Sequence, residues 1–404
     1  MSTLEQGADE GLFSVSGLIE RAQEQAGVAD ASILDTPGLR AISHSLSCAT
    51  DEMNFISSRR AQRLLNEALI KRLRLESYLQ REPAIRDIRL KSPIFLVAPA
   101  RTGTTFLHRL LAQDPEHRTL RLWEALQAPP ADPEYQGDPE YFKQDYRVAI
   151  ARKYLETRAR YTPDIAHIHH TSVDEPEECF GLLETSMLSH SFIFYGPVLE
   201  YLEWLDQRSD DEWLEAYRIY ADQLRLLQWW APGERWVMKT PFHMWAIDAL
   251  CATFPDALIV QQHRTPAACM ASYCSLMEVA YGPLAVNFGR EQIGQIAFSY
   301  YRDALARNVA ARKKLGDDQF IDIDYKELMS DPIGCVKRIY KAAGSGLKDS
   351  TAEIMQAWLA EQAKSRKKVS KHEYSLDDYG LDEEEVNEIF AGYSALNTSA
   401  SGDR

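Results

Sequence analysis

Apolar residues occur along this chain in two patterns, as short continuous runs and as longer stretches at helical spacing. Short apolar runs bounded by polar or turn-forming residues are typical of strands that are buried on both faces. Four such runs lie at residues 94–98, 235–239, 257–263 and 319–325. A helical pattern follows each of them. Strands that alternate with helices predict an α/β fold, in which a parallel β-sheet is flanked by helices.

Two further regions have helical spacing without strands. Residues 1–92 are expected to form a helical N-terminal extension, because Pro83 and Pro93 interrupt the pattern just before the first strand. The segment between the first two strands is rich in Trp and Tyr and too long for an ordinary crossover. We therefore expect residues 93–404 to form the α/β domain and residues 130–233 to form a helical insertion within it.

Charge and composition narrow the class of protein. The chain has 404 residues, 45% of them hydrophobic and 26% charged, which is typical of a globular protein. Its formal net charge of -15 argues against nucleic acid as a partner and against an anionic membrane surface. A site for an anionic ligand must then be a local basic pocket.

Targeting signals and cysteines indicate a cytoplasmic protein. The N-terminus lacks the basic and apolar regions of a secretory signal, and no segment has the roughly 18 apolar residues of a membrane span. The six cysteines contain no CxxC pair. This pattern favours reduced thiols over disulfides or a zinc site.

The turn after the first strand has the composition of an anion-binding loop. In "VAPARTGTTF" (97–106), Gly103 allows a tight turn, and the amides of residues 102–106 then lie at the start of a helix, where the helix dipole favours phosphate or sulfate. Arg101 adds a guanidinium fork suited to oxyanions. Three hydroxyl donors lie in the same turn: Thr102, Thr104 and Thr105. The lysine of a Walker A sequence is absent.

A second basic group follows the third strand. In "HRTPAACMAS" (263–272), Arg264 lies at the strand end and Ser272 lies two helical turns further on. These two side chains could hold a second anion. Two anion sites at neighbouring strand ends suit a nucleotide that is phosphorylated at both its 5′ and 3′ positions.

With these motifs, the chain resembles sulfotransferases that use 3′-phosphoadenosine 5′-phosphosulfate, and the bacterial type more than the animal cytosolic type. "PARTGTTF" is similar to the 5′-phosphosulfate loop of that family and "HRTPAACMAS" to its 3′-phosphate motif. "MKTPFHMW" resembles the strand with the family's lysine, and "FIDIDYKELMSDP" the strand whose tyrosine lies at the adenine. The resemblance covers residues 93–125 and 235–345 and implies a P-loop-like fold.

The resemblance also implies a role for each matching residue. Arg101 would stabilise charge on the leaving phosphate oxygen, and Lys239 would reach the sulfuryl group. The loop residues that would hold the 5′-phosphosulfate are Thr102, Gly103, Thr104 and Thr105. The residues that would hold the rest of the nucleotide are Arg264 and Ser272 at the 3′-phosphate, and Tyr325 and Phe106 at the adenine.

The base that takes the proton of the acceptor stays open among three candidates. His243 follows the lysine at a helix start, from which it could point into the cleft. Glu124 matches the position of a glutamate base in the tyrosylprotein branch, and as a base it would need a raised pKa. The third candidate is the polar cluster "HIHHTSVDEPEEC", with the side chains His169, His170, Glu175 and Glu178. Metal binding by "HIHH" is a further interpretation of that cluster.

The resemblance predicts in-line transfer of a sulfuryl group from 3′-phosphoadenosine 5′-phosphosulfate to the hydroxyl group of a small, apolar or phenolic acceptor, leaving adenosine 3′,5′-bisphosphate. Arg101 and Lys239 would supply positive charge without a metal ion. The aromatic insertion would bind the acceptor, although aromatic residues at helical spacing are more often core residues. A homodimer is left open.

Three alternatives remain. A P-loop kinase or nucleotide hydrolase would have the same strand, loop and helix, but its Walker lysine and acidic Mg²⁺ ligand are not evident. A nucleotide-binding protein without chemistry is disfavoured by the presence of Arg101 and Lys239. Sulfation followed by elimination of sulfate is a variant of the predicted reaction.

Overall fold

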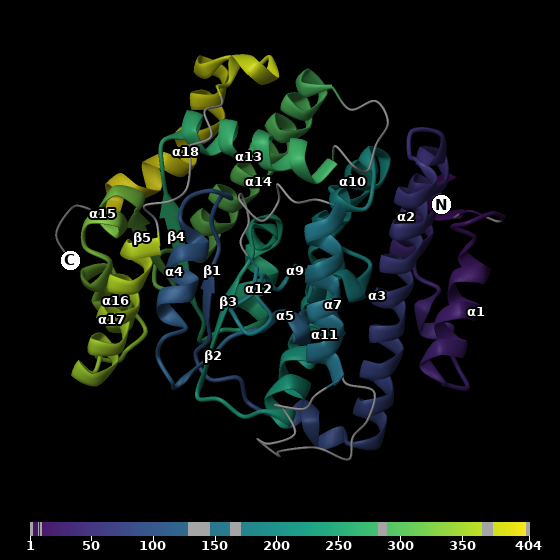
Figure 1. The fold of residues 1–404 in the computed structure, drawn as a ribbon, viewed down its shortest axis with the longest axis horizontal. Helices are drawn as coiled ribbons and strands as arrows, with labels where there is room; N and C mark the ends of the chain where they lie inside the picture. The colour runs from purple at the N-terminus through teal and green to yellow at the C-terminus, as the bar shows by residue number, and fades with distance from the viewer. Residues whose placement is uncertain are drawn as a thin grey trace.

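The protein, described by a computed structural model, is built around a parallel β-sheet. The structure describes residues 3–6, 8, 10–127, 146–161, 171–281, 289–365 and 375–400. Within this part of the chain the sheet has five strands in the order β2-β3-β1-β4-β5 (Figure 1). The strands are β1 (Ile94–Leu96), β2 (His117–Arg118), β3 (Arg235–Lys239), β4 (Leu258–His263) and β5 (Phe320–Asp324). The predicted α/β class and all four predicted strands are confirmed.

The strand β2 was not predicted, because its two polar residues carry no apolar pattern. It pairs with the start of β3, with Arg118 opposite Trp236. A strand of this length is recognised only from its pairing with a neighbour.

The sheet register places the ends of four strands at one edge. Leu96 of β1 lies opposite Lys239 of β3 on one side and opposite Val260 of β4 on the other, and all the pairings are parallel. Parallel strands end at the same edge of a sheet, which is where ligands bind in open α/β folds. The turn after β1, the last residue of β3 and the segments after β4 and β5 therefore meet at this edge.

Three helices precede the sheet and form a layer on one side of the molecule, at the right of Figure 1. They are α1 (Val15–Ala26), α2 (Pro37–Cys48) and α3 (Phe55–Arg81). Each begins at a polar side chain that accepts from a backbone amide of the first turn: Ser14, Thr36 and Asn54. Leu65 of α3 and Phe95 of β1 belong to one cluster of buried apolar side chains. The N-terminal helices therefore share a core with the sheet.

The helices between β2 and β3 contribute mostly to that same core. They are α5 (Leu122–Gln127), α7 (Tyr146–Tyr161), α9 (Phe180–Leu183), α10 (Leu199–Leu205) and α11 (Asp210–Trp230), with the 3₁₀ turns η5 (Glu184–Ser186) and η6 (His190–Phe194). Most of their aromatic rings are buried: Tyr201, Trp204, Tyr217, Tyr220 and Trp230. These rings pack the core, as aromatic residues at helical spacing usually do.

The remaining helices cover the sheet and the edge where its strands end. They are α4 (Thr104–Leu111), α12 (Ile247–Thr253), α13 (Pro266–Tyr281), α14 (Arg290–Leu315), α15 (Tyr325–Ser330), α16 (Pro332–Ala342), α17 (Asp349–Ser365) and α18 (Glu383–Ala400). The other 3₁₀ turns are η1 (Thr3–Gln6), η2 (Ser32–Leu34), η3 (Ala49–Asp51), η4 (Pro83–Asp87), η7 (Pro241–Trp245) and η9 (Asp377–Tyr379). Among the described residues, none of the helices has the length and apolar character needed to cross a membrane.

Candidate active site

The turn between β1 and α4 has an unusual backbone. Arg101 has a φ of 71° and Gly103 has a φ of 91°, both in the left-handed region. For Arg101 this conformation is strained, and such strain persists where the surroundings hold it. A Cβ added to Gly103 would lie 3.1 Å from Cδ2 of Tyr325, so the turn passes directly against the Tyr325 ring. The turn needs glycine at this position, and the amides at the start of α4 follow it.

The segments after β4 and β5 bind this turn. Arg264 donates from Nη1 to the carbonyl oxygen of Arg101 at 2.7 Å, and its guanidinium lies over the Tyr325 ring, 4.4 Å from the centroid. Arg101 in turn donates from Nε to the hydroxyl of Ser272 at 3.0 Å. The structure thus brings together residues that follow three strands, β1, β4 and β5. The sequence had placed these residues, Gly103 among them, in one site. Ser272 is thus linked to the turn through Arg101.

Two other predicted nucleotide residues have different surroundings. Thr102 is buried and its hydroxyl donates to the carbonyl of Pro99 at 2.8 Å, so this hydroxyl braces the turn. The ring of Phe106 packs against Trp358 of α17, with centroids 5.8 Å apart. Sequence reasoning missed Trp358, because it lies far along the chain in a helix that no motif marks.

Lys239 connects the turn to the insertion. It is the last residue of β3 and is 2% exposed. Its Nζ donates to Oγ1 of Thr105 at 3.3 Å and to Oε1 of Glu178 at 2.5 Å. The other carboxylate oxygen, Oε2 of Glu178, accepts from the hydroxyl of Thr240 at 3.3 Å. The lysine therefore lies between a hydroxyl of the turn and a carboxylate.

The position of His243 in the sequence would allow its side chain to point into a cleft, but in the structure it does not. It lies in η7 and is fully buried. Its Nδ1 forms a hydrogen bond with the hydroxyl of Tyr217 at 2.7 Å, and its Nε2 lies 3.3 Å from Sγ of Cys179. Burial lowers the pKa of His243 to about 3. Both ring nitrogens contact buried side chains, which leaves neither of them facing an acceptor.

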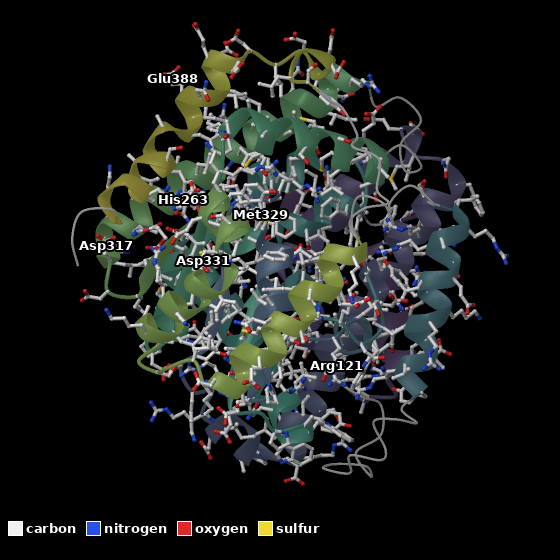
Figure 2. All side chains as sticks on the ribbon, turned by 60° about the vertical axis from the view of Figure 1, so that its left-hand side comes forward. Arg121, His263, Asp317, Met329, Asp331 and Glu388 are labelled. Carbon is white, nitrogen blue, oxygen red and sulfur yellow. The ribbon has the colours of Figure 1, made fainter. Side chains whose placement is uncertain are left out.

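Glu124 is held in a buried ion pair away from the turn. Its oxygens accept from Nη2 and Nη1 of Arg118 at 2.6 and 3.1 Å, and from the amide of Arg121 at 3.0 Å. Burial alone raises the pKa of Glu124, but the charge and hydrogen bonds of Arg118, the amide of Arg121 and the charge of Arg147 together outweigh it, and the pKa lies below its usual value. Figure 2 shows Arg121 well separated from His263, at the end of β4, and from Met329 of α15. Glu124 therefore lacks the raised pKa that a base would need.

The polar cluster before α9 is divided. His169 and His170 lie outside the described residues. Glu175 forms an ion pair with Arg109 of α4. Glu178 contacts the lysine of β3, as described above. Its side chain is 16% exposed, compared with 3% for that of Glu124.

Aromatic side chains lie in the segment after Glu178 and in the helices α13 and α14. Tyr273 of α13 and Tyr300 of α14 are stacked, with centroids 5.2 Å apart. Burial raises the pKa of both phenols, and the negative charge of Glu178 adds to the shift. Phe180 and Phe242 are in edge contact nearby, with centroids 6.1 Å apart. Sequence reasoning missed the two tyrosines, because no motif includes them.

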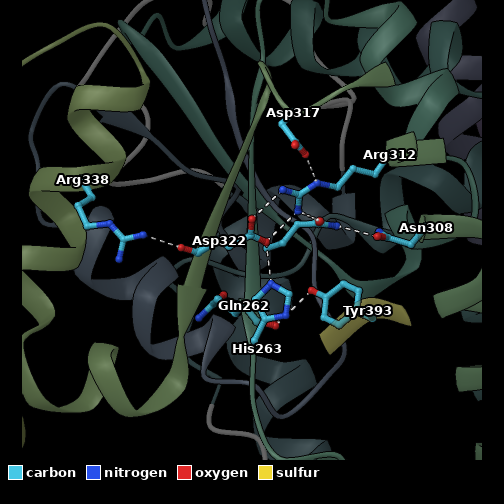
Figure 3. A network of polar contacts seen from close by, with 9 residues as sticks. Gln262, His263, Asn308, Arg312, Asp317, Asp322, Arg338 and Tyr393 are labelled. Atoms are coloured by element: carbon cyan, nitrogen blue, oxygen red, sulfur yellow. Dashed lines mark hydrogen bonds and ion pairs between the residues drawn. The ribbon is translucent and has the colours of Figure 1, made fainter. Parts of the chain in front are cut away.

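A buried polar network supports the ends of β4 and β5 (Figure 3). Asp322 accepts from Nη1 and Nη2 of Arg312 at 2.8 and 2.7 Å, and its Oδ1 lies 2.7 Å from Nε2 of His263. The ring of Tyr393 stacks on His263, with centroids 4.6 Å apart. Burial raises the pKa of Asp322, but Arg312 and His263 outweigh it and the pKa is lowered. Because His263 directly precedes Arg264, this network fixes the strand end from which Arg264 extends.

A parallel sheet with a glycine-containing turn between β1 and α4, and with basic residues at its strand ends, is typical of the P-loop-like fold. The family model described as the sulfotransferase family matches residues 93–349. This match covers more than half of the chain, and the protein belongs to the sulfotransferase family. It is an enzyme that transfers a sulfuryl group to a hydroxyl acceptor.

Several characterised relatives and solved structures are similar over most of their length. The omega-hydroxy-beta-dihydromenaquinone-9 sulfotransferase Stf3 of Mycobacterium bovis is 25% identical over 309 residues, which are 74% of each chain. The structure of sulfotransferase STF1 from Mycobacterium tuberculosis has a TM-score of 0.79 and 33% identity, covering 94% of this chain and 98% of that one. Sulfotransferase STF9 from Mycobacterium avium has a TM-score of 0.79 and 25% identity, covering 98% and 97%.

Proposed function

We propose that this sulfotransferase moves the sulfuryl group of 3′-phosphoadenosine 5′-phosphosulfate to the hydroxyl of an apolar or phenolic acceptor, and that Glu178 is the base. One observation carries the proposal: the ammonium of Lys239 contacts both the hydroxyl of Thr105 in the anion-binding turn and the carboxylate of Glu178. Donor binding and proton removal then take place on two sides of one lysine.

The groups around the turn fit a donor with two separate anionic ends. The bound donor supplies the activated sulfuryl group. Arg101 and Lys239 lie where the charge of the transferring group develops, and positive charge fixed in place is the main source of rate in such transfers. These cations make the proposed reaction independent of a metal ion. We assign the 5′-phosphosulfate to the amides and hydroxyls of the turn: Thr102, Gly103, Thr104 and Thr105.

The other end of the donor is assigned to the segments after β4 and β5. Arg264 and Ser272 would hold the 3′-phosphate, and Tyr325 and Phe106 would contact the adenine. Support comes from the packing of Arg264 on the Tyr325 ring and from the contact of Tyr325 with the turn. A nucleotide held there would span both basic groups.

Glu178 is preferred as the base because its carboxylate is accessible and adjacent to Lys239. The turn and Glu178 compete for the same ammonium, so an anion bound at the turn draws Lys239 away from the carboxylate. Glu178 is then free to accept the proton of the acceptor hydroxyl. His243 and Glu124 offer no comparable contact, since each is enclosed by other partners.

The acceptor is proposed to be apolar because of the rings near Glu178. Phe180 is partly buried and lies beside Phe194 and Phe242, with centroids 6.5 and 6.1 Å apart. The name of the relative Stf3 describes a hydroxylated menaquinone, an apolar alcohol.

We propose that residues 130–233 form the acceptor-binding insertion of a domain spanning residues 93–404, with residues 1–92 as its helical extension. All six cysteines are free thiols, which supports a cytoplasmic reaction.

The test combines ligand binding with turnover. Adenosine 3′,5′-bisphosphate should raise the melting temperature by mass action, whereas adenosine 5′-monophosphate should do so weakly. Arg264→Ala should remove most of that difference. Sulfur-labelled donor should transfer label to apolar alcohols or phenols, including in the presence of a chelator. Stabilisation by ATP with Mg²⁺ alone, without transfer of label, would instead support a kinase or hydrolase.

A further inference from the structure

Three side chains with metal-binding atoms gather where the N-terminal helix α2 meets α10. His44 and Cys48 lie one turn apart on α2, and Glu200 lies in the first turn of α10. One ligand atom of each lies within 4.8 Å of the others. The spacing of residues in the sequence does not reveal this group, because Glu200 lies far along the chain from His44 and Cys48.

The geometry of the first two side chains matches a tetrahedral zinc ion. Residues four apart on a helix lie on one face, so His44 and Cys48 can bind one ion. Zinc binds thiolate sulfur at about 2.3 Å and imidazole nitrogen at about 2.0–2.1 Å, so in a tetrahedral site these two atoms lie about 3.6 Å apart. The distance from Sγ of Cys48 to Nε2 of His44 is 3.6 Å.

Charge and position also suit a divalent cation. A thiolate and a carboxylate together balance the two charges of the ion, and the imidazole adds a neutral ligand. We propose that His44, Cys48 and Glu200 form a Zn²⁺ site that clips α2 to α10 and leaves a fourth position for water.

The clip would act on the segment that leads toward the acceptor region. The helix α2 packs against α10, and the two lie next to each other in Figure 1. The turn η6, with Phe194 at its end, comes shortly before α10 in the chain. Zinc binding would therefore stabilise the segment of the insertion that contains η6 and α10. This effect would not depend on a bound nucleotide.

Without a metal ion, the same contact is a weak hydrogen bond between a thiol and an imidazole. A cation bound between the two side chains would make Cys48 a thiolate ligand. The metal-bound and metal-free arrangements thus differ in an observable property, the thiolate.

Cobalt titration distinguishes the two arrangements. Reduced full-length protein, freed of metal by a chelator, is titrated with Co²⁺. We expect one equivalent to bind, with a thiolate-to-cobalt charge-transfer band and the intense visible bands of tetrahedral cobalt, and Zn²⁺ to displace it. Cys48→Ser should abolish the charge-transfer band. His44→Ala and Glu200→Gln should each weaken binding at least about tenfold, because loss of even an outer-shell partner of a metal ligand typically costs that much.

The matched control is Glu203→Gln, which changes another exposed acid of α10 and should leave the affinity for Co²⁺ unchanged. Thermal unfolding of the metal-free variants checks that each one folds. The proposal is overturned if no charge-transfer band appears. It is also overturned if folded His44→Ala or Glu200→Gln binds Co²⁺ as tightly as the unchanged protein.

Discussion

Lys239 and Glu178 form an ion pair at the base of the anion-binding turn, with 2.5 Å between Nζ and Oε1. The two residues come from different regions, Lys239 from β3 and Glu178 from the segment before α9. The amide of Cys179 also donates to the carbonyl of Lys239 at 3.1 Å, so the backbones of the two segments are fixed to each other. The fold therefore holds the backbone next to Glu178 in place and keeps its carboxylate within reach of Lys239.

Glu178→Gln should lower kcat while donor affinity is kept. We expect a loss of about 10² to 10⁴ in kcat, because the proton of the acceptor has no base. The affinity for adenosine 3′,5′-bisphosphate should stay the same or rise, since Lys239 loses its competing partner. Calorimetry and single-turnover transfer measure the two effects. Glu175→Gln is the matched control, because Glu175 pairs with Arg109 instead. Near-normal turnover of Glu178→Gln would remove Glu178 as the base.

Gly103→Ala should weaken nucleotide binding more than its backbone strain explains. The new Cβ would meet the Tyr325 ring at 3.1 Å and push apart the two segments that flank the proposed adenine position. Gly316→Ala is the control, since Gly316 also has a positive φ, 80°, but an added Cβ there meets nothing within 4 Å. Both variants should lose about 1 kcal/mol or more of stability, and only Gly103→Ala should raise the Kd of the bisphosphate. Equal Kd values for the two variants would contradict the assigned contact.

Glu124→Gln should affect stability rather than chemistry. The change leaves the buried guanidinium of Arg118 without its charged partner, at a cost of about 3–5 kcal/mol. Urea unfolding measures this loss. The double variant Arg118→Met with Glu124→Leu should recover much of it, because no unpaired charge remains. A large loss of kcat with unchanged stability would instead support Glu124 as the base.

Stability should fall with acid because two histidines are buried in neutral form. Burial lowers the pKa of both His108 and His243 to about 3, while in the unfolded chain each has a pKa near its ordinary 6.5. Between these values the unfolded state binds more protons, so each histidine contributes stability that is full above pH 6.5 and is lost as the pH falls toward 3. The loss from pH 7 to pH 5 is about 2 kcal/mol for each.

Urea midpoints at the two pH values test this slope. His243→Gln should be less stable at pH 7, because the packing beside Tyr217 changes, but it should lose about 2 kcal/mol less on acidification. Its kcat should stay within about tenfold of normal, since His243 does not face the proposed acceptor site. A pH dependence identical to that of the unchanged protein would show that folding does not lower the pKa of His243.

Much of the sheet edge could be predicted from the sequence. The turn after β1 and the residues Arg264 and Tyr325 each belong to a continuous strand-turn-helix segment, and local pattern marks such segments. Because parallel strands end at one edge, three local predictions combined into one site without knowledge of the packing. The strand β2 escaped prediction, since its two polar residues have no periodicity.

The sequence by itself determined the class of sheet, the anion-binding turn and the basic residues around it, because these depend on neighbours along the chain. Only the tertiary structure shows how the surroundings of His243, Glu124 and Glu178 differ, and the proposal of Glu178 as the base depends on that difference. Their surroundings come from segments distant in sequence: Tyr217 encloses His243, and Lys239 meets Glu178. Burial and charge of a titratable side chain are set by such long-range packing, which no local motif contains. The gathering of His44 and Cys48 with Glu200 was decided in the same way.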